Sequence, residues 1–311
     1  MRDHAPANFQ TSGCTIGDTA CLCCGGNKTV SENTLVSAYF SYKAFSSSPS
    51  PCLLVHCLSC GFKFYNRRIT DEEGSAYYSG YRDEKYFIER HHYEPFYTRS
   101  VHDGLSEHMC SSARRDTVAA ALRKSGASNH FNSIIDYGGG DGALITDLPA
   151  ERRISFDPSG TPGQPGIEVV DNRASLPPAV DLVICAQVLE HVSDPKALVS
   201  DMVSLLRPGG LVYLEVPDQS WRRFTSLRPS RAFFEWLSRH PRMLLAADIF
   251  STFFRVKLGT LPPFGFVPMR EHINFFSASA LRAIAMTDTL VVRAEGYTSD
   301  KSFWLVSEKC R

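Results

Sequence analysis

The sequence predicts an α/β fold: a doubly wound parallel sheet preceded by a small N-terminal module folded around a metal ion. Apolar segments of strand length alternate with helical segments in the second half of the chain, and a glycine-rich turn follows the first such strand. Cysteines gather near the N-terminus. At 311 residues the chain has room for one full α/β domain and a smaller one.

The overall charge of the chain does not indicate any class of binding partner. The 33 basic and 33 acidic side chains cancel, so attraction to an anionic ligand or surface must come from a local patch. The first residues lack the apolar core of a signal peptide, and no segment approaches the roughly 20 apolar residues of a membrane span. We therefore expect a cytoplasmic protein, in which clustered cysteines serve more often as metal ligands or catalytic groups than as disulfides.

Seven of the ten cysteines lie between Cys14 and Cys60. They include two C-x-x-C-G units that are separated by 32 residues. Two intervening residues let both sulfurs of a unit reach one tetrahedral ion at about 2.3 Å, and the glycine that follows accepts a positive φ. A structural Zn²⁺ is therefore predicted, with four thiolate ligands: Cys21, Cys24, Cys57 and Cys60.

Two simpler interpretations of these cysteines remain open: a C-x-x-C redox pair, or cysteines that are merely buried. Cys23, Cys52 and His56 lie nearby in sequence and are alternative ligands. A segment of this size with few large apolar residues gains little from burial, so a zinc ion contributing about 10–16 kcal/mol would fold it.

A glycine loop follows the first strand of the main domain. The apolar run 133–136 leads into Gly138, Gly139 and Gly140, and a helix is expected directly afterwards. Glycines let the backbone approach a ligand closely, and a helix N-terminus favours an anionic group. Asp157 stands 19 residues after Gly138, at the end of the next strand, where a carboxylate would bind ribose hydroxyls. A dinucleotide would satisfy this pattern as well.

Motifs later in the sequence distinguish a dinucleotide from another nucleoside cofactor. The sequence D-x-G-x-G-x-G, then D-P-S, then D-L-V-x-x-x-x-V-L-E-H-V-x-D-P, and finally L-L-R-P-G-G-L-V-Y-L-E-V-P-D spans roughly residues 130–218. This ordered series resembles class I S-adenosylmethionine-dependent methyltransferases. The resemblance implies a Rossmann-like seven-stranded sheet that binds S-adenosylmethionine.

The resemblance also implies a set of cofactor-binding residues. Asp136, Gly138 and Gly140 would line the methionine end of the cofactor, and Asp157 would bind the ribose. Asp171 or Asn172 would lie near the adenine. Gln187 and Val188 would lie beside the reacting sulfonium. Glu190 and His191 follow; they either take part in the reaction or only fix the geometry of their loop.

The segment E-H-x-x-F-F-S around Glu271 and His272 resembles an H-E-H-x-x-Y-F-S segment of deoxysugar C-methyltransferases, which also begin with paired C-x-x-C units. In that family the Glu-His pair belongs to the active site. The resemblance implies that His272, held by Glu271, deprotonates the acceptor, with His191 as another candidate base. Arg270 and Met269 stand where that family has histidine and tyrosine.

An insertion separates the two resembling segments. Residues 219–257 hold seven arginines and one lysine against Glu235 and Asp248, so eight positive charges face two negative ones. Such a patch suits a phosphate-bearing acceptor. A solvated helix face and contact with an anionic membrane surface are the alternatives, because an apolar run over 243–256 lies alongside.

The predicted organisation is a zinc-ribbon-like module at 1–70, a helical connector at 71–125, and a methyltransferase domain at 126–311 with a lid insertion at 219–270. The expected reaction is methyl transfer to a small-molecule or glycan acceptor, which is anionic: a nucleotide-linked sugar, or a sugar of surface-polysaccharide or secondary metabolism. RNA or protein methylation guided by the zinc module is an alternative, although basic residues are too sparse in that module for a nucleic-acid footprint. A non-catalytic cofactor-binding scaffold is another.

Overall fold

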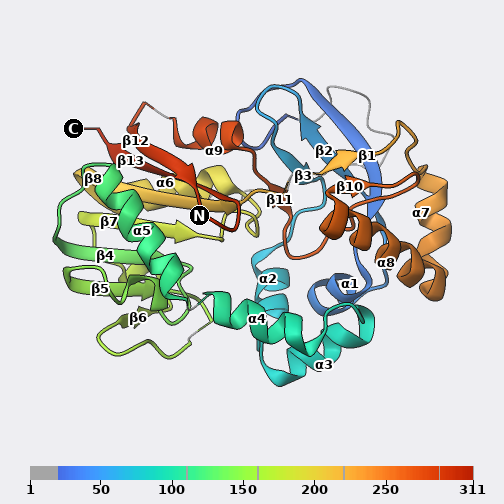
Figure 1. Ribbon diagram of the computed structural model, residues 1–311, viewed down its shortest axis with the longest axis horizontal. Coiled ribbons are helices and arrows are strands. Elements are labelled where there is room, and N and C mark those ends of the chain that lie inside the picture. The colour runs from blue at the N-terminus through green and yellow to red at the C-terminus, as the bar shows by residue number, and fades with distance from the viewer. Residues whose placement is uncertain (1–19, 110, 160, 220, 287, 311) are drawn as a thin grey trace.

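The computed structural model describes residues 20–109, 111–159, 161–219, 221–286 and 288–310. Residues 1–19 of the predicted zinc module therefore lie outside the described residues. Within the described ranges the main sheet has seven strands in the order β12-β13-β8-β7-β4-β5-β6 (Figure 1). They are β4 (Phe131–Tyr137), β5 (Ala150–Phe156), β6 (Glu168–Val170), β7 (Val180–Ala186), β8 (Leu206–Pro217), β12 (Leu290–Tyr297) and β13 (Ser302–Lys309).

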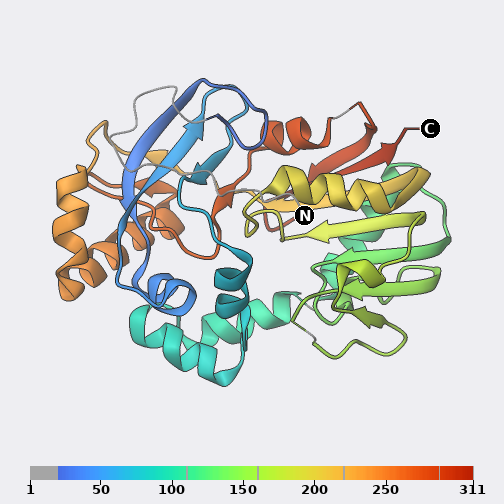
Figure 2. The same cartoon turned by 180° about the vertical axis from the view of Figure 1, so that it is seen from behind.

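Strands β4 to β8 run parallel to one another, and β13 lies antiparallel between β8 and β12. All seven residues of β7 are buried, as expected of a central parallel strand with both faces covered. Helix α5 (Ser112–Lys124) covers one face, while α6 (Pro195–Leu205) and α9 (Ala278–Ala285) cover the other (Figures 1 and 2). The predicted doubly wound, seven-stranded architecture is confirmed.

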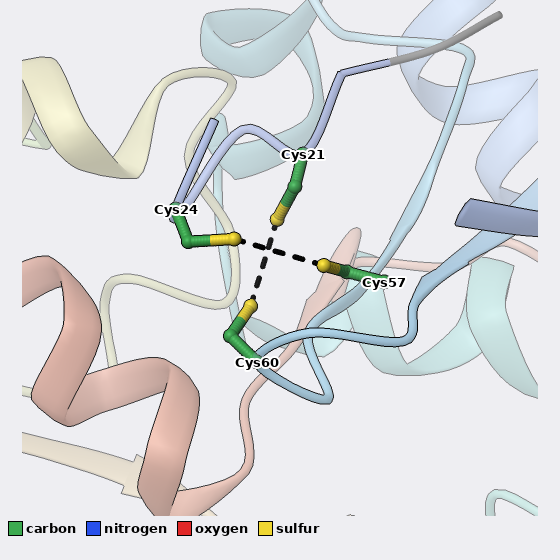
Figure 3. Close-up of side chains that lie close together, drawn as sticks. All are labelled: Cys21, Cys24, Cys57 and Cys60. Atoms are coloured by element: carbon green, nitrogen blue, oxygen red, sulfur yellow. Dashed lines mark hydrogen bonds between the residues drawn. The ribbon is translucent and has the colours of Figure 1, made fainter. Parts of the chain in front are cut away.

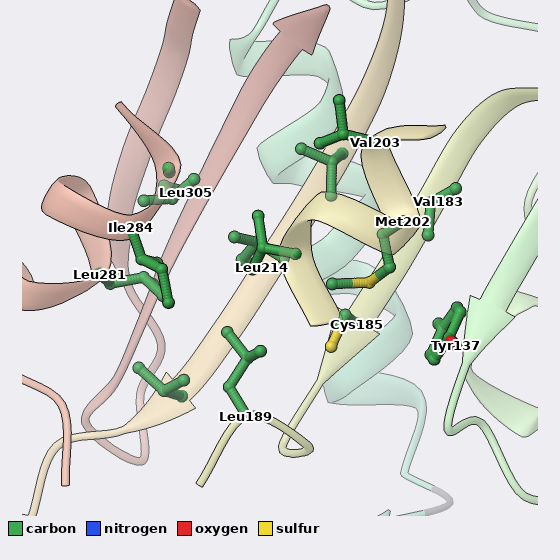
Figure 4. Packing of buried hydrophobic residues seen from close by; sticks show 14 of the residues in the cluster. Tyr137, Val183, Cys185, Leu189, Met202, Val203, Leu214, Leu281, Ile284 and Leu305 are labelled. Carbon is green, nitrogen blue, oxygen red and sulfur yellow. The ribbon is translucent and has the colours of Figure 1, made fainter. Parts of the chain in front are cut away.

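Two hydrophobic clusters fill the spaces between the sheet and its helices. On the α6 and α9 face, Met202 and Ile284 pack over Leu214 of the sheet (Figure 4). On the α5 face, Val118 and Leu122 belong to the second cluster. Because each face of the sheet is sealed by apolar side chains, polar groups of the site are confined to the edge where the strands end.

Helix α6 begins as its sequence predicts. Asp194 is the N-cap, its side chain accepts a hydrogen bond from the Ala197 N–H, and Pro195 occupies the first turn, where its missing N–H costs no hydrogen bond.

The prediction of a helix directly after the glycine loop is wrong. A single 3₁₀ turn, η1 (Ala143–Ile145), takes its place. Pro149 follows closely and disfavours the helical conformation at the residue before it, so the segment has room for only one turn before β5 begins.

A second sheet combines distant parts of the chain. It contains β1 (Thr29–Leu35), β2 (Pro51–Cys57), β3 (Lys63–Tyr65) and β11 (Asn274–Phe275), in that order. The pairing of β11 with β3 joins the N-terminal segment directly to the residues that follow His272.

Six further helices among the described residues lie outside the main sheet. They are α1 (Ala38–Phe45), α2 (Asp71–Tyr78), α3 (Glu84–Tyr93), α4 (Arg99–Met109), α7 (Arg231–Ser238) and α8 (Pro241–Leu258). Of these, α7 contacts β1 and β2. The short pair β9 (Arg222–Arg223) and β10 (Thr260–Leu261) flanks α7 and α8, which pack at the end of the molecule far from the main sheet (Figure 1). The predicted domain boundaries stay predictions. No helix among the described residues has both the length and the apolar character to cross a bilayer.

Candidate functional site

The candidate site lies where the parallel strands end. The glycine loop follows β4, Asp157 follows β5, Asp171 follows β6 and Gln187 follows β7. Because β4 to β7 are parallel neighbours, these four segments meet at the carboxyl edge of the sheet, where ligands bind in open α/β folds.

The glycine loop needs its glycines for space. Gly138 has φ +78°, and a Cβ at this position would lie 2.7 Å from the Val188 side chain. Gly140 has φ +55°, and a Cβ there would meet no atom within 4 Å. The loop is therefore packed against Val188 on one side and open at Gly140, so a ligand can approach its backbone.

Asp136, the last acidic residue before the loop, is almost fully buried, and its Oδ2 atom has no hydrogen-bond partner in the described part of the chain. Burial raises the pKa of its carboxyl from the ordinary 3.8 to about 7. A buried carboxyl of this kind can be satisfied by a cationic ligand group. The methionine ammonium of S-adenosylmethionine is such a group, so Asp136 fits its predicted role.

The predicted ribose and adenine contacts lie further along the same edge. The two oxygens of Asp157 accept hydrogen bonds from the backbone N–H groups of Gly140 (2.9 Å) and Ser159 (2.8 Å). The carboxylate thus holds its own turn and keeps further lone pairs for a ligand. Asp171 is exposed, while Asn172 caps the short helix η2 (Arg173–Ser175).

Gln187 and Val188 differ in what they face. Gln187 adopts φ +62°, and its amide donates to Glu215 (2.9 Å) and Ser302 (3.0 Å) on neighbouring strands. The side chain of Gln187 therefore links two strands of the main sheet, and only its backbone lies along the site. Val188 packs against Gly138. The assignment of both to the sulfonium end stays a prediction.

Beyond Val188, Glu190, His191 and His272 come together. One potential ligand atom from each lies within 4.8 Å of the others, and the two imidazole rings have centroids 4.6 Å apart. Glu190 is buried, and neither carboxylate oxygen has a hydrogen-bond partner in the described residues. Burial raises the pKa of Glu190 to about 8. Burial, and then the neighbouring His191, lower the pKa of His272 to about 3, so this imidazole is neutral at pH 7.

Each imidazole has its Nδ1 atom engaged. Nδ1 of His191 lies 2.9 Å from the main-chain oxygen of Glu271, and Nδ1 of His272 lies 2.9 Å from Oε1 of Gln219. Since both oxygens accept, both Nδ1 atoms carry the proton. The Nε2 lone pairs are consequently available to a proton or a ligand.

The expectation that Glu271 holds His272 is wrong. The Glu271 carboxylate instead accepts hydrogen bonds from Arg90 (3.0 Å) and Tyr77 (3.3 Å). Burial by itself raises the pKa of Glu271, but Arg90, followed by His272, a main-chain hydrogen bond and Arg270, together outweigh it, so the pKa falls below its usual range. The carboxylate stays ionised because helix α3 supplies a buried guanidinium. What Glu271 orients is His191, through its main-chain oxygen.

Two residues that sequence reasoning missed fix this loop. The Asn274 side chain donates to the main-chain oxygens of Leu189 (2.8 Å) and Val192 (2.7 Å). Arg68 donates to the oxygens of Val192 and Ser193 and to the Asn274 side chain. In the sequence Arg68 is one of the few basic residues of the N-terminal module. Nothing in the sequence shows that its partners in this loop lie more than a hundred residues away.

The four predicted zinc ligands lie together (Figure 3). Cys21 and Cys60 have their sulfurs 3.6 Å apart, Cys24 and Cys57 have theirs 3.7 Å apart, and all four sulfurs lie within 4.8 Å of one another. Four thiolates around one zinc ion at about 2.3 Å would be about 3.8 Å apart. Gly25 and Gly61 have φ of +72° and +76°, as expected after each pair. The donor set and its spacing fit a closed tetrahedral ion.

The alternative ligands lie elsewhere. The Cys23 thiol donates to the Ala280 oxygen at 3.0 Å, and Cys52 is buried in a separate apolar cluster. His56 lines a small hollow with Lys63 and Trp221.

The basic insertion is partly neutralised. Arg223 and Arg228 pair with Glu32 of β1, and Arg231 pairs with Glu235. Asp248 pairs instead with Arg270, which lies beyond residue 257. The predicted phosphate patch is therefore smaller than the count of arginines implies.

The sheet order, the glycine loop and the polar groups at the strand ends together define the architecture of a class I S-adenosylmethionine-dependent methyltransferase. A family described as a methyltransferase domain matches residues 107–287, which is more than half of the chain. The chain belongs to that family.

Individual relatives are more distant. The chain is 32% identical over 124 residues to a ubiquinone biosynthesis O-methyltransferase of Xanthomonas campestris pv. campestris, a match that covers 34% of this chain and 50% of the relative. The chain thus spans about half the length of the curated relatives it matches.

Solved structures with a similar fold include two methyltransferases. The N-methyltransferase NodS from Bradyrhizobium japonicum WM9 is 14% identical with a TM-score of 0.38, covering 64% of this chain and 97% of that one. Magnesium protoporphyrin IX methyltransferase from Synechocystis PCC 6803 with bound S-adenosylmethionine is 17% identical with a TM-score of 0.39, covering 68% and 85%.

Proposed function

We propose that this protein transfers the methyl group of S-adenosylmethionine to a small acceptor at the carboxyl edge of the main sheet. The observation that carries the proposal is Asp136: a buried, unpartnered carboxyl beside a loop that is open at Gly140, in a chain of the methyltransferase family. Such a carboxyl matches the cationic end of this cofactor, whereas a nicotinamide dinucleotide would place an anionic pyrophosphate near it.

The cofactor supplies a methyl group on a positively charged sulfur, already activated for transfer. The chain must then align the acceptor and remove its proton. Alignment contributes about 7–11 kcal/mol and a base about 10²–10⁴ in rate. The new O–CH₃ or C–CH₃ bond takes its electron pair from the acceptor, the pair of the broken S–CH₃ bond stays on sulfur, and the acceptor proton passes to the neutral Nε2 of His272.

The proposed acceptor is a sugar carried on a nucleotide, or a sugar of surface-polysaccharide or secondary metabolism. The Glu271–His272 segment and the four-cysteine cluster support it by their resemblance to deoxysugar C-methyltransferases. The relative named as an O-methyltransferase supports a hydroxyl as the reacting group. The cysteine cluster, in this proposal, holds a structural Zn²⁺.

The test is to incubate the protein with S-adenosylmethionine labelled in its methyl group and with separate panels of nucleotide sugars, glycans, phenols and RNA. Label in a nucleotide sugar or glycan supports the proposal. Label in RNA or in protein alone contradicts the acceptor class. Calorimetry with S-adenosylhomocysteine runs in parallel: absence of binding by wild type at millimolar ligand contradicts the proposed cofactor itself.

A further inference from the structure

The cluster formed by Glu190, His191 and His272 has more ligand capacity than a base requires. All three ligand atoms lie within 4.8 Å of one another, and His191 Nε2 is 3.9 Å from Glu190 Oε1. A first-row divalent ion bonds imidazole nitrogen and carboxylate oxygen at about 2.0–2.2 Å, which places neighbouring ligands about 3–4 Å apart. The separations of the three atoms are therefore close to those that one ion requires.

Both imidazoles are in the form that binds metal. The proton of each ring lies on Nδ1, where it is donated to the Glu271 main-chain oxygen or to Gln219, so each Nε2 has a free lone pair. A hydrogen bond from the second ring nitrogen to a carbonyl is the outer-shell arrangement typical of metal-binding histidines, because it fixes both tautomer and ring orientation.

Glu190 supplies the independent observation. It is 1% exposed, and both of its oxygens lack a hydrogen-bond partner among the described residues. A buried carboxyl without donors costs free energy unless a cation compensates it. Its backbone is nevertheless held firmly, because the Glu190 oxygen accepts from the N–H groups of Ile273 and Asn274. The unpartnered side chain is thus held beside Nε2 of His191, 3.9 Å away, and one ring nitrogen of His272 lies within 4.8 Å of both residues' ligand atoms.

We infer that Glu190, His191 and His272 bind a divalent transition-metal ion. Two imidazoles and one carboxylate suit zinc, cobalt or manganese, and they leave coordination positions open. This site differs from the four-cysteine cluster, whose ligands close the coordination shell.

The chemical role of the ion rests on the proposed function. An open position would take the acceptor hydroxyl, and the ion would lower the pKa of that hydroxyl so that its proton leaves to water. Nε2 of His272 would then be a ligand, so proton transfer to His272 belongs to the metal-free site alone.

The test uses protein loaded with one zinc per chain, in which the thiolates retain zinc against cobalt. Cobalt titration should add weak visible bands of a nitrogen and oxygen site, without the intense near-ultraviolet bands of cobalt thiolate. Glu190→Gln and His191→Gln should each weaken cobalt binding at least about 100-fold, more than the 10–100-fold cost of losing an outer-shell partner. His92→Gln, at an exposed histidine, is the matched control and should bind cobalt as wild type does.

The inference is overturned if wild type shows no such bands at millimolar cobalt, or if the variants bind cobalt as wild type does. Calorimetry with S-adenosylhomocysteine and a thermal scan accompany each variant. A variant that melts and binds S-adenosylhomocysteine as wild type does is folded, so its loss of cobalt reports the metal site. Cobalt binding without cofactor binding by wild type would contradict the proposed function and leave the metal site standing.

Helix α8 exposes several large apolar side chains on its outward side. Phe250, Phe253 and Val256 are 47%, 54% and 67% exposed, whereas Asp248 and Ser251 on the same helix are buried. The inward face is polar because Asp248 pairs with Arg270. An exposed apolar stripe of this kind marks a contact surface.

We propose that this stripe docks on an anionic lipid surface. Arg239, Arg242 and Lys257 are exposed at the two ends of α8, and no acidic residue of α8 is exposed. Apolar side chains framed by basic ones match the boundary between headgroups and acyl chains. The test is flotation with vesicles of about three parts phosphatidylcholine to one part phosphatidylglycerol, against pure phosphatidylcholine.

Wild type should float with the anionic vesicles, and Phe253→Ser should reduce the floated fraction several-fold. Ile88→Ser removes a similarly exposed apolar side chain from α3 and should leave the floated fraction unchanged. Equal flotation with both lipids, or self-association in ultracentrifugation that Phe253→Ser abolishes without any flotation, overturns the proposal.

Discussion

At the scale of single residues, the site contains carboxyls whose environments differ sharply. Asp136 and Glu190 are buried without donors, so burial raises the pKa of each, whereas Glu271 is buried beside Arg90 and has a lowered pKa. Divergent pKa values of neighbouring acids are typical of functional sites. The unpaired carboxyls are the groups that a cationic ligand would stabilise.

Asp136 predicts a pH dependence of stability. Its pKa is about 7 in the folded protein and 3.8 ordinarily, so the folded state binds more protons between these values and loses stability as the pH rises through that window. Asp136→Asn should therefore stabilise the ligand-free protein at pH 8 by up to about 4 kcal/mol, with the gain vanishing near pH 4. Urea unfolding at both pH values measures this. The same variant should bind S-adenosylhomocysteine more weakly, and unchanged binding would contradict the assigned role.

We expect substitution of His272 to change turnover without changing cofactor binding. His272→Ala should lower kcat about 10²–10⁴-fold because it removes the group proposed to take the acceptor proton. Calorimetric binding of S-adenosylhomocysteine should stay at the wild-type value, since His272 lies beyond the cofactor loop. Wild-type turnover in this variant would remove His272 from the reaction.

At the scale of elements, the loop after β7 is shaped by parts of the chain that are remote in sequence. Asn274 at the start of β11 and Arg68 beyond β3 together bind the main-chain oxygens of the loop. The side chain of Arg68 is mostly enclosed, and burial lowers its pKa to about 10, which leaves it charged at pH 7. A charged donor that satisfies several carbonyls fixes the positions of Glu190 and His191.

Arg68→Met should consequently destabilise the protein by about 2–4 kcal/mol, because buried carbonyls would lose charged donors. Denaturant unfolding with a two-state fit measures this loss. Arg67→Met is the matched control: Arg67 is more exposed and pairs with Glu73 near the surface, so its loss should cost less than about 1 kcal/mol. Equal losses for the two variants would show that the loop does not depend on Arg68.

At the scale of the whole molecule, the cysteine cluster and the site share one sheet. β11 pairs with β3, which follows the second cysteine pair, and β11 begins two residues after His272. Ser277 and Ser279 donate to the Cys60 oxygen and extend the contact to α9. An ion bound by the four cysteines would thereby position one side of the site.

Removal of the ion should therefore affect the site at a distance. Chelation, or Cys57→Ser, should release about one zinc per chain, lower the Tm and reduce kcat, because β3 would no longer hold β11. Cys310→Ser, at an exposed cysteine, should change none of these. A metal-sensitive dye and a thermal scan give the measurement. Full turnover by a form that has lost the zinc bound by the cysteines would disprove the coupling.

The sequence by itself determined the main sheet, the glycine loop, the strand-end residues and the four clustered cysteines. Each depends on local patterns: apolar runs fix strands, glycines fix the turn, and C-x-x-C spacing fixes a ligand pair. It also indicated Glu271, His272 and His191 as candidate site residues, without showing which of them meet.

Only the tertiary structure decided what those residues face. The single 3₁₀ turn after the glycine loop, the inward turn of Gln187, the capture of Glu271 by Arg90 and the pairing of β11 with β3 all depend on contacts between distant segments. Packing and burial decide which partner a side chain meets. Because such partners lie far apart along the chain, no periodic pattern in the sequence indicates the contact. For the same reason the meeting of Glu190 with both histidines emerges only in three dimensions.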